Sequence, residues 1–208
     1  MILIGQYDSP FVRRVGIALT LYGIGFEHKP WSTFREGDKI APYNPLRRVP
    51  VLVLDDGEVL IDSPTMIDYL DAQAVVPLMA RRGVDRQKAL YIMALATGLA
   101  DKAVSLFYEQ AFHPAPSDLW VDRCRQQITE GLAVLESECL RLTTQFWFGE
   151  QPGHADIAVA CALRFIAEAH GGLLDFKACP ALEAHHQACE ALPVFQAIAQ
   201  TFSPPGRS

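Results

Sequence analysis

Residues 44–64 read NPLRRVPVLVLDDGEVLIDSP, and this stretch limits the folds open to the rest of the chain. Two apolar runs, at 51–54 and 59–61, are rich in Val, Leu and Ile and are bounded by turn-forming residues, which predicts two strands. The Asp-Gly pair between the runs supplies the positive φ of a tight hairpin, so the strands are antiparallel. Ser63 and Pro64 follow at once, and a small polar residue before proline is typical of a helix start. The stretch therefore predicts a hairpin followed directly by a helix.

The residues before this stretch predict a strand, a helix and a further strand. The apolar run at 2–4 and the segment Phe-Glu-His-Lys at 26–29 are interpreted as strands. Between them, Ser9 is an expected N-cap, Pro10 the expected first helical residue and Gly23 the expected stop. The first part of the chain is therefore a small α/β unit.

The residues after this stretch predict only helices. Helical periodicity lapses between residues 75 and 85, which marks a linker. We accordingly expect two domains, an α/β domain at 1–76 and an all-α domain at 85–202. The long amphipathic stretches beyond the linker lie at 86–112, 117–143, 156–170 and 180–200.

The composition excludes several classes of protein. Half of the 208 residues are hydrophobic and 20% are charged, which is typical of a folded chain, and no uninterrupted apolar run reaches membrane-spanning length. A net charge of -6 gives no general attraction to nucleic acid or to anionic lipid. The opening residues lack the basic flank and the length of a signal peptide. We therefore expect a cytoplasmic protein that binds neither nucleic acid nor a membrane.

The cysteines and histidines predict neither disulfides nor a metal site. The five cysteines are an odd number and form no CxxC pair. His170, His185 and His186 have no acidic or cysteine partners at ligand spacing, so packed or solvated histidines are expected. Arg13 and Arg14 are expected on the solvated face of the first helix.

Two serines and one proline are candidates for ligand binding. A helix N-terminus offers unpaired N–H donors and a partial positive charge, so Ser9 and Ser63 could each hold an anion. The alternative is that each is an ordinary N-cap. Pro50 opens a strand, and a cis Val49-Pro50 bond would turn the N–H and C=O of Val49 toward a peptide-like ligand, whereas an ordinary trans proline is the alternative.

Four features together resemble the glutathione S-transferase family. They are the N-capping Ser9, the Val-Pro that opens the third strand, the Asp-Ser-Pro that opens a helix after the fourth strand, and the all-helical second part of the chain. The resemblance implies a thioredoxin-like domain that binds glutathione, with beta-, omega- and zeta-like bacterial features and a serine as the catalytic residue. In this reading Ser9 is catalytic. Val49 meets the backbone of the glutathione cysteine, Arg48 meets the glycine carboxylate, and Asp62 and Ser63 hold the γ-glutamyl group.

The resemblance extends to the helical domain. Gly153 and Asp156 resemble the family's Ser/Thr-x-x-Asp capping box, with Gly153 in place of the hydroxyl residue, so Asp156 has a structural role, as does Pro50. Phe11, Tyr108 and Phe112 are implied walls of an electrophile pocket, although ordinary core packing is the alternative for such aromatic residues.

The implied function is that of a glutathione transferase, in which glutathione is the co-substrate and attacks a small hydrophobic electrophile. Two alternatives stay open. One is a zeta-like isomerase, although residues 8–11, Asp-Ser-Pro-Phe, lack the Ser-Ser-Cys run typical of that group. The other is a binding or interaction protein that keeps the fold without turnover. A homodimer is expected from the resemblance.

Overall fold

The computed structural model describes residues 1–204 and divides into two compact units. Within the described residues, the first comprises Met1–Leu78 together with residues 193–204, and the second comprises Met79–Leu192. The sequence boundaries placed residues up to 202 in the helical domain. The difference arises at Pro193, after which the chain packs on the first unit.

The first unit is built on a four-stranded mixed sheet. Strands β1 (Ile2–Ile4) and β2 (Glu27–Lys29) are parallel, and β1 is antiparallel to β3 (Val51–Val53). β3 and β4 (Val59–Ile61) form the predicted antiparallel hairpin, and the strand order is β2-β1-β3-β4. This topology and the helices around it confirm the predicted thioredoxin-like class.

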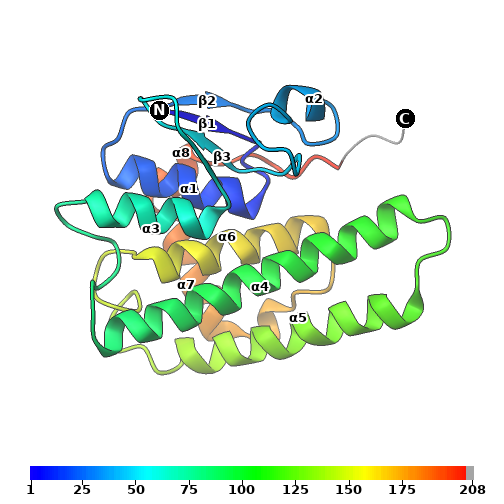
Figure 1. Cartoon of the computed structure of the whole chain (residues 1–208). Coiled ribbons are helices and arrows are strands. Elements are labelled where there is room, and N and C mark those ends of the chain that lie inside the picture. Colours follow the sequence, from blue (N-terminus) through cyan, green and yellow to red (C-terminus); the bar gives the residue numbers. More distant parts are fainter. Residues whose placement is uncertain (205–208) are drawn as a thin grey trace. The chain divides into compact units, whose positions relative to one another are not determined.

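Both faces of the sheet are covered. Helices α1 (Pro10–Leu21) and α3 (Ser63–Gln73) pack against one face (Figure 1). On the other side, Ile40 of the short helix α2 (Gly37–Ile40), which the sequence analysis did not predict, is fully buried in a cluster with Ile4 and Val51. The core between the sheet and the two longer helices contains Leu3, Val12, Val15, Leu19, Leu52, Met66 and Leu70.

The expectation that Arg13 and Arg14 are solvated is wrong. Their exposed fractions are 1% and 2%. The Arg13 guanidinium donates to the carbonyl oxygens of Ile198 and Phe195 at 2.8 and 2.9 Å, so its donors are satisfied by the returning C-terminal chain. A pattern confined to one helix could not reveal partners 182 and 185 residues away.

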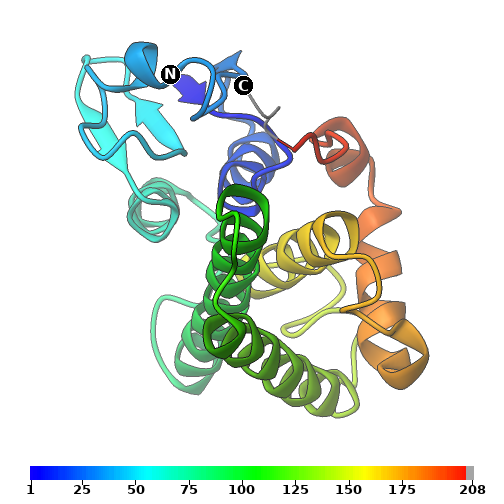
Figure 2. The ribbon, with the colours of Figure 1, turned by 90° about the vertical axis from the view of Figure 1, so that its right-hand side faces the viewer.

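The second unit is a bundle of helices. α4 (Val84–Phe112), α5 (Asp118–Cys139) and α6 (His154–Ala169) pack together, and α7 (Pro180–Glu190) lies against α5 and α6 after the short 3-10 helix η1 (Phe176–Ala178) (Figure 2). By length and composition alone α4 could cross a membrane, with a mean hydropathy of 1.4 over its most apolar window. In this fold its inward side chains pack against α5 and α6.

The predicted helix at 180–200 is two helices. α7 ends at Glu190, and α8 (Pro193–Ala197) begins at a proline. Pro193 has no N–H to donate and cannot continue the preceding helix.

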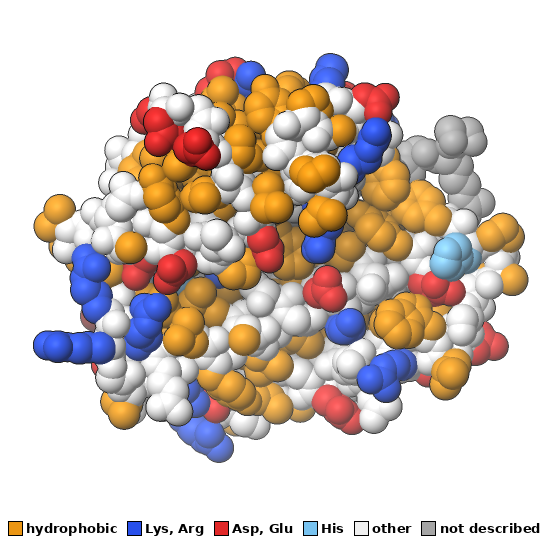
Figure 3. Space-filling view, in the orientation of Figure 1, with side chains coloured by type: hydrophobic (Ala, Val, Ile, Leu, Met, Phe, Trp, Pro, Cys, Tyr) orange, Lys and Arg blue, Asp and Glu red, His pale blue; other side chains and the backbone are white. Residues whose placement is uncertain are grey.

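On the face drawn in Figure 3, acidic and basic side chains are interspersed with hydrophobic ones.

Candidate functional site

Ser9 lies at the start of α1, in the loop that follows β1. Its backbone is extended, with φ -71° and ψ 123°, and its hydroxyl oxygen accepts a hydrogen bond from Val12 N at 3.4 Å. Pro10 has no N–H and therefore needs no partner in the first turn. Because the Ser9 oxygen acts as the acceptor in this cap, its hydroxyl proton is available to donate to an anion beside the positive end of the helix dipole.

Gly5 brings the first turn of α1 close to the segment that contains Val49. Its φ is +129°, a conformation that favours glycine. A Cβ at this position would lie 2.5 Å from Val12 Cγ2 and 2.8 Å from Val49 Cβ. The absence of a side chain at Gly5 therefore allows both the Val12 and the Val49 side chains to pack close to the Gly5 main chain, just after β1.

The Val49-Pro50 peptide bond is cis. The loop before it is shaped by buried Asn44, whose Nδ2 donates to Arg48 O at 2.9 Å and whose Oδ1 accepts from Leu46 N at 3.0 Å. Within residues 1–204, no hydrogen bond involves the main-chain N–H or C=O of Val49. Both groups can therefore pair with an extended peptide. The Arg48 side chain is exposed on the same loop.

The start of α3 differs from the sequence expectation. Asp62, with φ 70°, is the N-cap residue, but its side chain makes no cap hydrogen bond, and Ser63 is the first helical residue. Asp62 is exposed, whereas Ser63 has an exposed fraction of 0%. The Ser63 hydroxyl accepts a hydrogen bond from Arg14 Nη1 at 3.5 Å. Because this bond uses the Ser63 oxygen as acceptor, the hydroxyl proton is left to donate elsewhere.

Arg14 is the site residue that the sequence analysis missed. A buried guanidinium beside the N-terminus of α3 adds a full positive charge to the partial charge of the helix dipole, which favours a carboxylate at this position. The signal was present in the spacing, because Arg14 lies four residues before Ala18 and eight before Tyr22 on the apolar face of α1. A charged residue on the apolar face of a helix indicates a side chain that is buried and needs a specific partner.

Tyr7 provides a second hydroxyl close to Ser9 in the sequence. Its ring stacks on His28, with centroids 3.8 Å apart and an angle of 11° between the planes. The His28 ring nitrogen Nε2 lies 2.7 Å from Gly5 O and must carry a proton, since a carbonyl oxygen only accepts. Burial raises the pKa of the Tyr7 phenol to about 12. Tyr7 is therefore a weaker acid than an ordinary tyrosine and is held by packing.

The aromatic residues predicted to line an electrophile pocket belong to different units. Phe11 is partly buried in the first turn of α1. Tyr108 and Phe112 lie one helical turn apart on α4, with ring centroids 5.6 Å apart, and both are exposed. Phe107 packs against the ring of His170 within the second unit.

Asp156 is a buried acceptor in the second unit. Its Oδ2 accepts from Gly153 N at 2.8 Å, and its Oδ1 accepts from Trp147 N at 3.1 Å and lies 2.8 Å from His185 Nε2. Gly153 has no side chain to return the bond, so only the carboxylate half of the capping box forms. With an exposed fraction of 0%, Asp156 ties together α6, α7 and the loop before α6.

Neither a reactive thiol nor a metal cluster is found in the described part of the chain. Burial raises the pKa of Cys139 to about 12 and raises that of Cys189 further, so both stay protonated. Across residues 1–204, no group of three or more His, Cys, Asp or Glu side chains could hold a metal ion. The polar groups at the ends of β1, α1 and α3 are therefore the best candidates for chemistry.

Two family models match the chain. The model described as "Glutathione S-transferase, N-terminal domain" matches residues 3–77, and the model described as "Glutathione S-transferase, C-terminal domain" matches residues 118–188.

Curated relatives and solved structures agree with these models. The chain is 35% identical over 168 residues to the uncharacterized GST-like protein YibF of Escherichia coli, covering 80% of this chain and 82% of that one. It is 31% identical over 187 residues to maleylacetoacetate isomerase of Pseudomonas aeruginosa, covering 84% and 85%. A glutathione transferase family member from Pseudomonas fluorescens, crystallised with bound glutathione, is 33% identical with a TM-score of 0.84 and coverage of 98% and 99%.

Proposed function

Because this chain belongs to the glutathione S-transferase family, we propose that its first unit binds glutathione and that Ser9 stabilises the glutathione thiolate for attack on a small hydrophobic electrophile. The observation that carries the proposal is the close packing at Gly5, against which both Val12 of the first turn of α1 and Val49 lie. The first segment supplies the Ser9 hydroxyl as a donor to a thiolate. The second supplies the N–H and C=O of Val49, which make no hydrogen bond within residues 1–204 and can pair with the backbone of a thiol-bearing peptide. The solved relative with bound glutathione supports the choice of ligand.

Each part of glutathione has an expected partner. The backbone of its cysteine pairs with the N–H and C=O of Val49, and its glycine carboxylate meets Arg48. The γ-glutamyl carboxylate lies at the N-terminus of α3, where Ser63 donates its hydroxyl proton and Arg14 supplies the charge behind it, while exposed Asp62 holds the amino group. A carboxylate gains from the dipole and from a charge-assisted hydrogen bond at such a position.

The interactions at Ser9 can reach the free energy that thiolate formation requires. A glutathione thiol with a pKa of about 8.5 is only about 3% ionised at pH 7. Lowering the pKa by about two units requires roughly 2.7 kcal/mol of preference for the anion. A hydrogen bond from the Ser9 hydroxyl to the anion contributes about 1.5 to 3 kcal/mol, and the α1 dipole contributes about 0.3 to 1 kcal/mol.

The reaction then proceeds in two steps. The thiol proton passes to solvent when glutathione binds, and the thiolate is held by Ser9. The sulfur attacks the electrophilic carbon, a C–S bond forms, and the leaving group departs with the electrons of the broken bond. Because a serine hydroxyl cannot form a mixed disulfide, this chemistry is transfer and not thiol–disulfide exchange.

A second candidate function is a glutathione-dependent isomerase. The relative from Pseudomonas aeruginosa is named maleylacetoacetate isomerase and is 31% identical over most of both chains, which favours this candidate. In such a reaction the same thiolate would add to an activated double bond and leave again after rotation. The lack of a Ser-Ser-Cys run before α1 makes it the second choice.

We also propose that the protein is a cytoplasmic homodimer, as its family resemblance implies. Phe11, Tyr108 and Phe112 remain the proposed contacts of the electrophile. Sedimentation of the purified chain tests the dimer, and the KM for the electrophile in an alanine variant of each aromatic residue tests the contacts.

Two parallel assays distinguish the candidate reactions. Glutathione is mixed with the protein and a generic aryl halide, and in a separate sample with a cis-enediketone. Halide release with consumption of glutathione supports the transferase, whereas cis–trans conversion without consumption of glutathione supports the isomerase. Glutathione binding without either reaction would support a binding protein instead.

Calorimetry with paired arginine variants tests the proposed binding of glutathione. Arg14→Met removes the buried charge, and Arg82→Met removes the same charge from an exposed position in the second unit. Loss of a hydrogen bond from a charged group costs about 1.5 to 3 kcal/mol, so Arg14→Met is expected to weaken glutathione binding by roughly 10-fold or more. Circular dichroism checks that both variants fold. Equal affinity in the two variants would exclude Arg14 from the site.

A further inference from the structure

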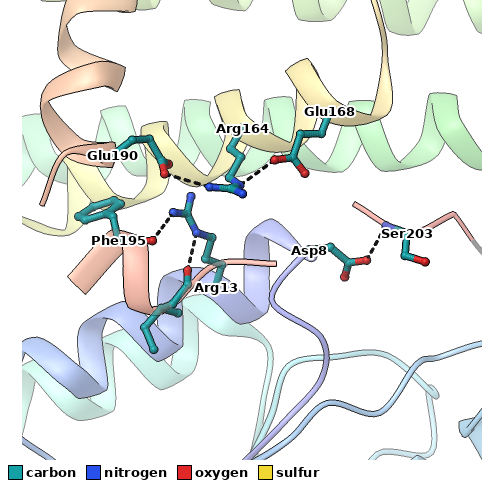
Figure 4. A network of polar contacts seen from close by, with 8 residues as sticks. Asp8, Arg13, Arg164, Glu168, Glu190, Phe195 and Ser203 are labelled. Atoms are coloured by element: carbon teal, nitrogen blue, oxygen red, sulfur yellow. Dashed lines mark hydrogen bonds and ion pairs between the residues drawn. The ribbon is translucent and has the colours of Figure 1, made fainter. Parts of the chain in front are cut away.

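The C-terminal segment of residues 193–204, which we term the C-terminal strap, is anchored to α1 by a buried charge. Arg13 Nε donates to Ile198 O at 2.8 Å, and Arg13 Nη2 donates to Phe195 O at 2.9 Å (Figure 4). The guanidinium carbon also lies 5.6 Å from the centroid of the Phe195 ring, and both side chains are buried. A buried guanidinium that donates to two carbonyls holds this part of the strap in a fixed position.

Beyond this anchor, the strap reaches the loop that carries Ser9. Gln200 Oε1 accepts a hydrogen bond from Tyr7 N at 3.2 Å. Ser203 N donates to Asp8 Oδ2 at 3.2 Å, a contact drawn in Figure 4. Tyr7 and Asp8 are the two residues immediately before Ser9, so both contacts hold the main chain that leads into the proposed catalytic residue.

The stacking of the Tyr7 ring on His28 and two main-chain hydrogen bonds also hold the loop. Gly5 N donates to Lys29 O at 2.9 Å, and Ser9 N donates to Gln6 O at 3.1 Å. The first bond fixes only the beginning of the loop, and the second lies within the loop. The hydrogen bond from Tyr7 N to Gln200 therefore ties the middle of the loop to a segment that Arg13 anchors.

We propose that Gln200 is a positioning residue, which holds the loop after β1 so that the Ser9 hydroxyl points at the glutathione sulfur. This inference rests on the proposed function of Ser9. The Gln200 side chain acts through the Tyr7 main chain and not on the substrate. A misplacement of about 1 Å in a catalytic group can cost about 100-fold in rate, so a small change in the loop is expected to reduce turnover.

The proposal predicts which kinetic quantities change when the Gln200 acceptor is lost. The expected partners of the glutathione backbone and carboxylates lie on the Val49 loop and at the start of α3, whereas the hydrogen bond of Gln200 goes to the main chain of Tyr7. Loss of the Gln200 acceptor should therefore reduce thiolate stabilisation and kcat while the KM for glutathione changes little. A residue that only stabilised the fold would not separate these quantities.

The test compares Gln200→Met, which keeps the length of the side chain but removes the acceptor, with Gln73→Met at the exposed last residue of α3. Two readouts are taken for the full-length chain: kcat and KM for glutathione with an aryl halide, and the pKa of the bound thiol from the ultraviolet absorbance of the thiolate across pH. We expect Gln200→Met to lower kcat by about 5- to 20-fold and to raise the thiol pKa by roughly one unit, with KM within about twofold. Gln73→Met should match the wild type.

Three results would overturn the inference. A lowered thiol pKa in the wild type that persists unchanged in Gln200→Met would overturn it while leaving the role of Ser9 intact. A parallel loss in both glutamine variants, or a rise in KM equal to the fall in kcat, would identify a merely structural role. An unshifted thiol pKa in the wild-type complex would refute the proposed function and this inference together.

Discussion

Replacing Ser9 by alanine removes two interactions at once, and a second serine of the chain allows them to be separated. The Ser9 hydroxyl accepts from Val12 N at the start of α1, and the Ser117 hydroxyl accepts from Trp120 N at the start of α5, both at 3.4 Å. Loss of an N-cap serine costs about 0.5 to 2 kcal/mol of stability. Ser9→Ala and Ser117→Ala should therefore lower the free energy of unfolding by similar amounts, measured by urea denaturation.

Only Ser9→Ala should lose activity. Removal of a donor to the thiolate costs about 1.5 to 3 kcal/mol, which corresponds to a fall of roughly 10- to 160-fold in kcat/KM. The same loss raises the pKa of the bound thiol by about one to two units. The assay is the initial rate of aryl-halide conjugation for both variants and the wild type. Turnover of Ser9→Ala within about twofold of that of Ser117→Ala would refute the reasoning.

Three further predictions follow from the same structure. Ser9→Cys places a thiol at a helix N-terminus, where the pKa of the thiol falls and a mixed disulfide with glutathione can form. The variant should therefore gain glutathione-dependent disulfide reduction, which the wild type lacks. A variant that has an accessible thiol but no such activity would contradict this. Asp156→Ala removes a buried acceptor of three hydrogen bonds and should lower the free energy of unfolding, measured by urea denaturation, by about 3 to 5 kcal/mol. The control Asp175→Ala, at the exposed cap of η1, should lower it by about 1 kcal/mol. Equal losses in the two variants would contradict a stabilising role for the buried hydrogen bonds of Asp156. The raised pKa values of Cys139 and Cys189 mean that less of each thiol is ionised at any given pH. A colorimetric disulfide reagent should therefore modify these two thiols slowly in the native chain, and should reach all five thiols only after denaturation. Rapid labelling of Cys139 or Cys189 in the native chain would contradict their burial.

Local sequence signals predicted the elements of the first unit well. The Asp-Gly hairpin, the Ser9 cap and the proline at the first helical position each depend on residues close in sequence, and the structure contains all three. The helix that begins near Ser63 was also predicted. Its cap was displaced by one residue, because the choice between Asp62 and Ser63 depends on a backbone with φ 70° that the sequence pattern does not determine.

Long-range partners could not be predicted. Arg14 was assigned to solvent because a basic pair on a surface helix is usually solvated, yet its partner Ser63 lies 49 residues away. The contact between Gln200 and Tyr7 spans 193 residues and joins a side chain to a main-chain N–H, which leaves no trace in local periodicity. The short helix α2 was missed because four residues are too few to show helical periodicity.

The central claim, that the bound glutathione is a thiolate, is tested most directly by the number of protons released on binding. Calorimetric titration at pH 7 in two buffers of different ionisation enthalpy measures this number, and S-methylglutathione, which has no thiol proton, corrects for every other group. With a bound thiol pKa of about 6.5, the account predicts release of about 0.7 of a proton per glutathione in excess of S-methylglutathione. Equal proton release for the two ligands, or no binding of glutathione at all, would contradict it.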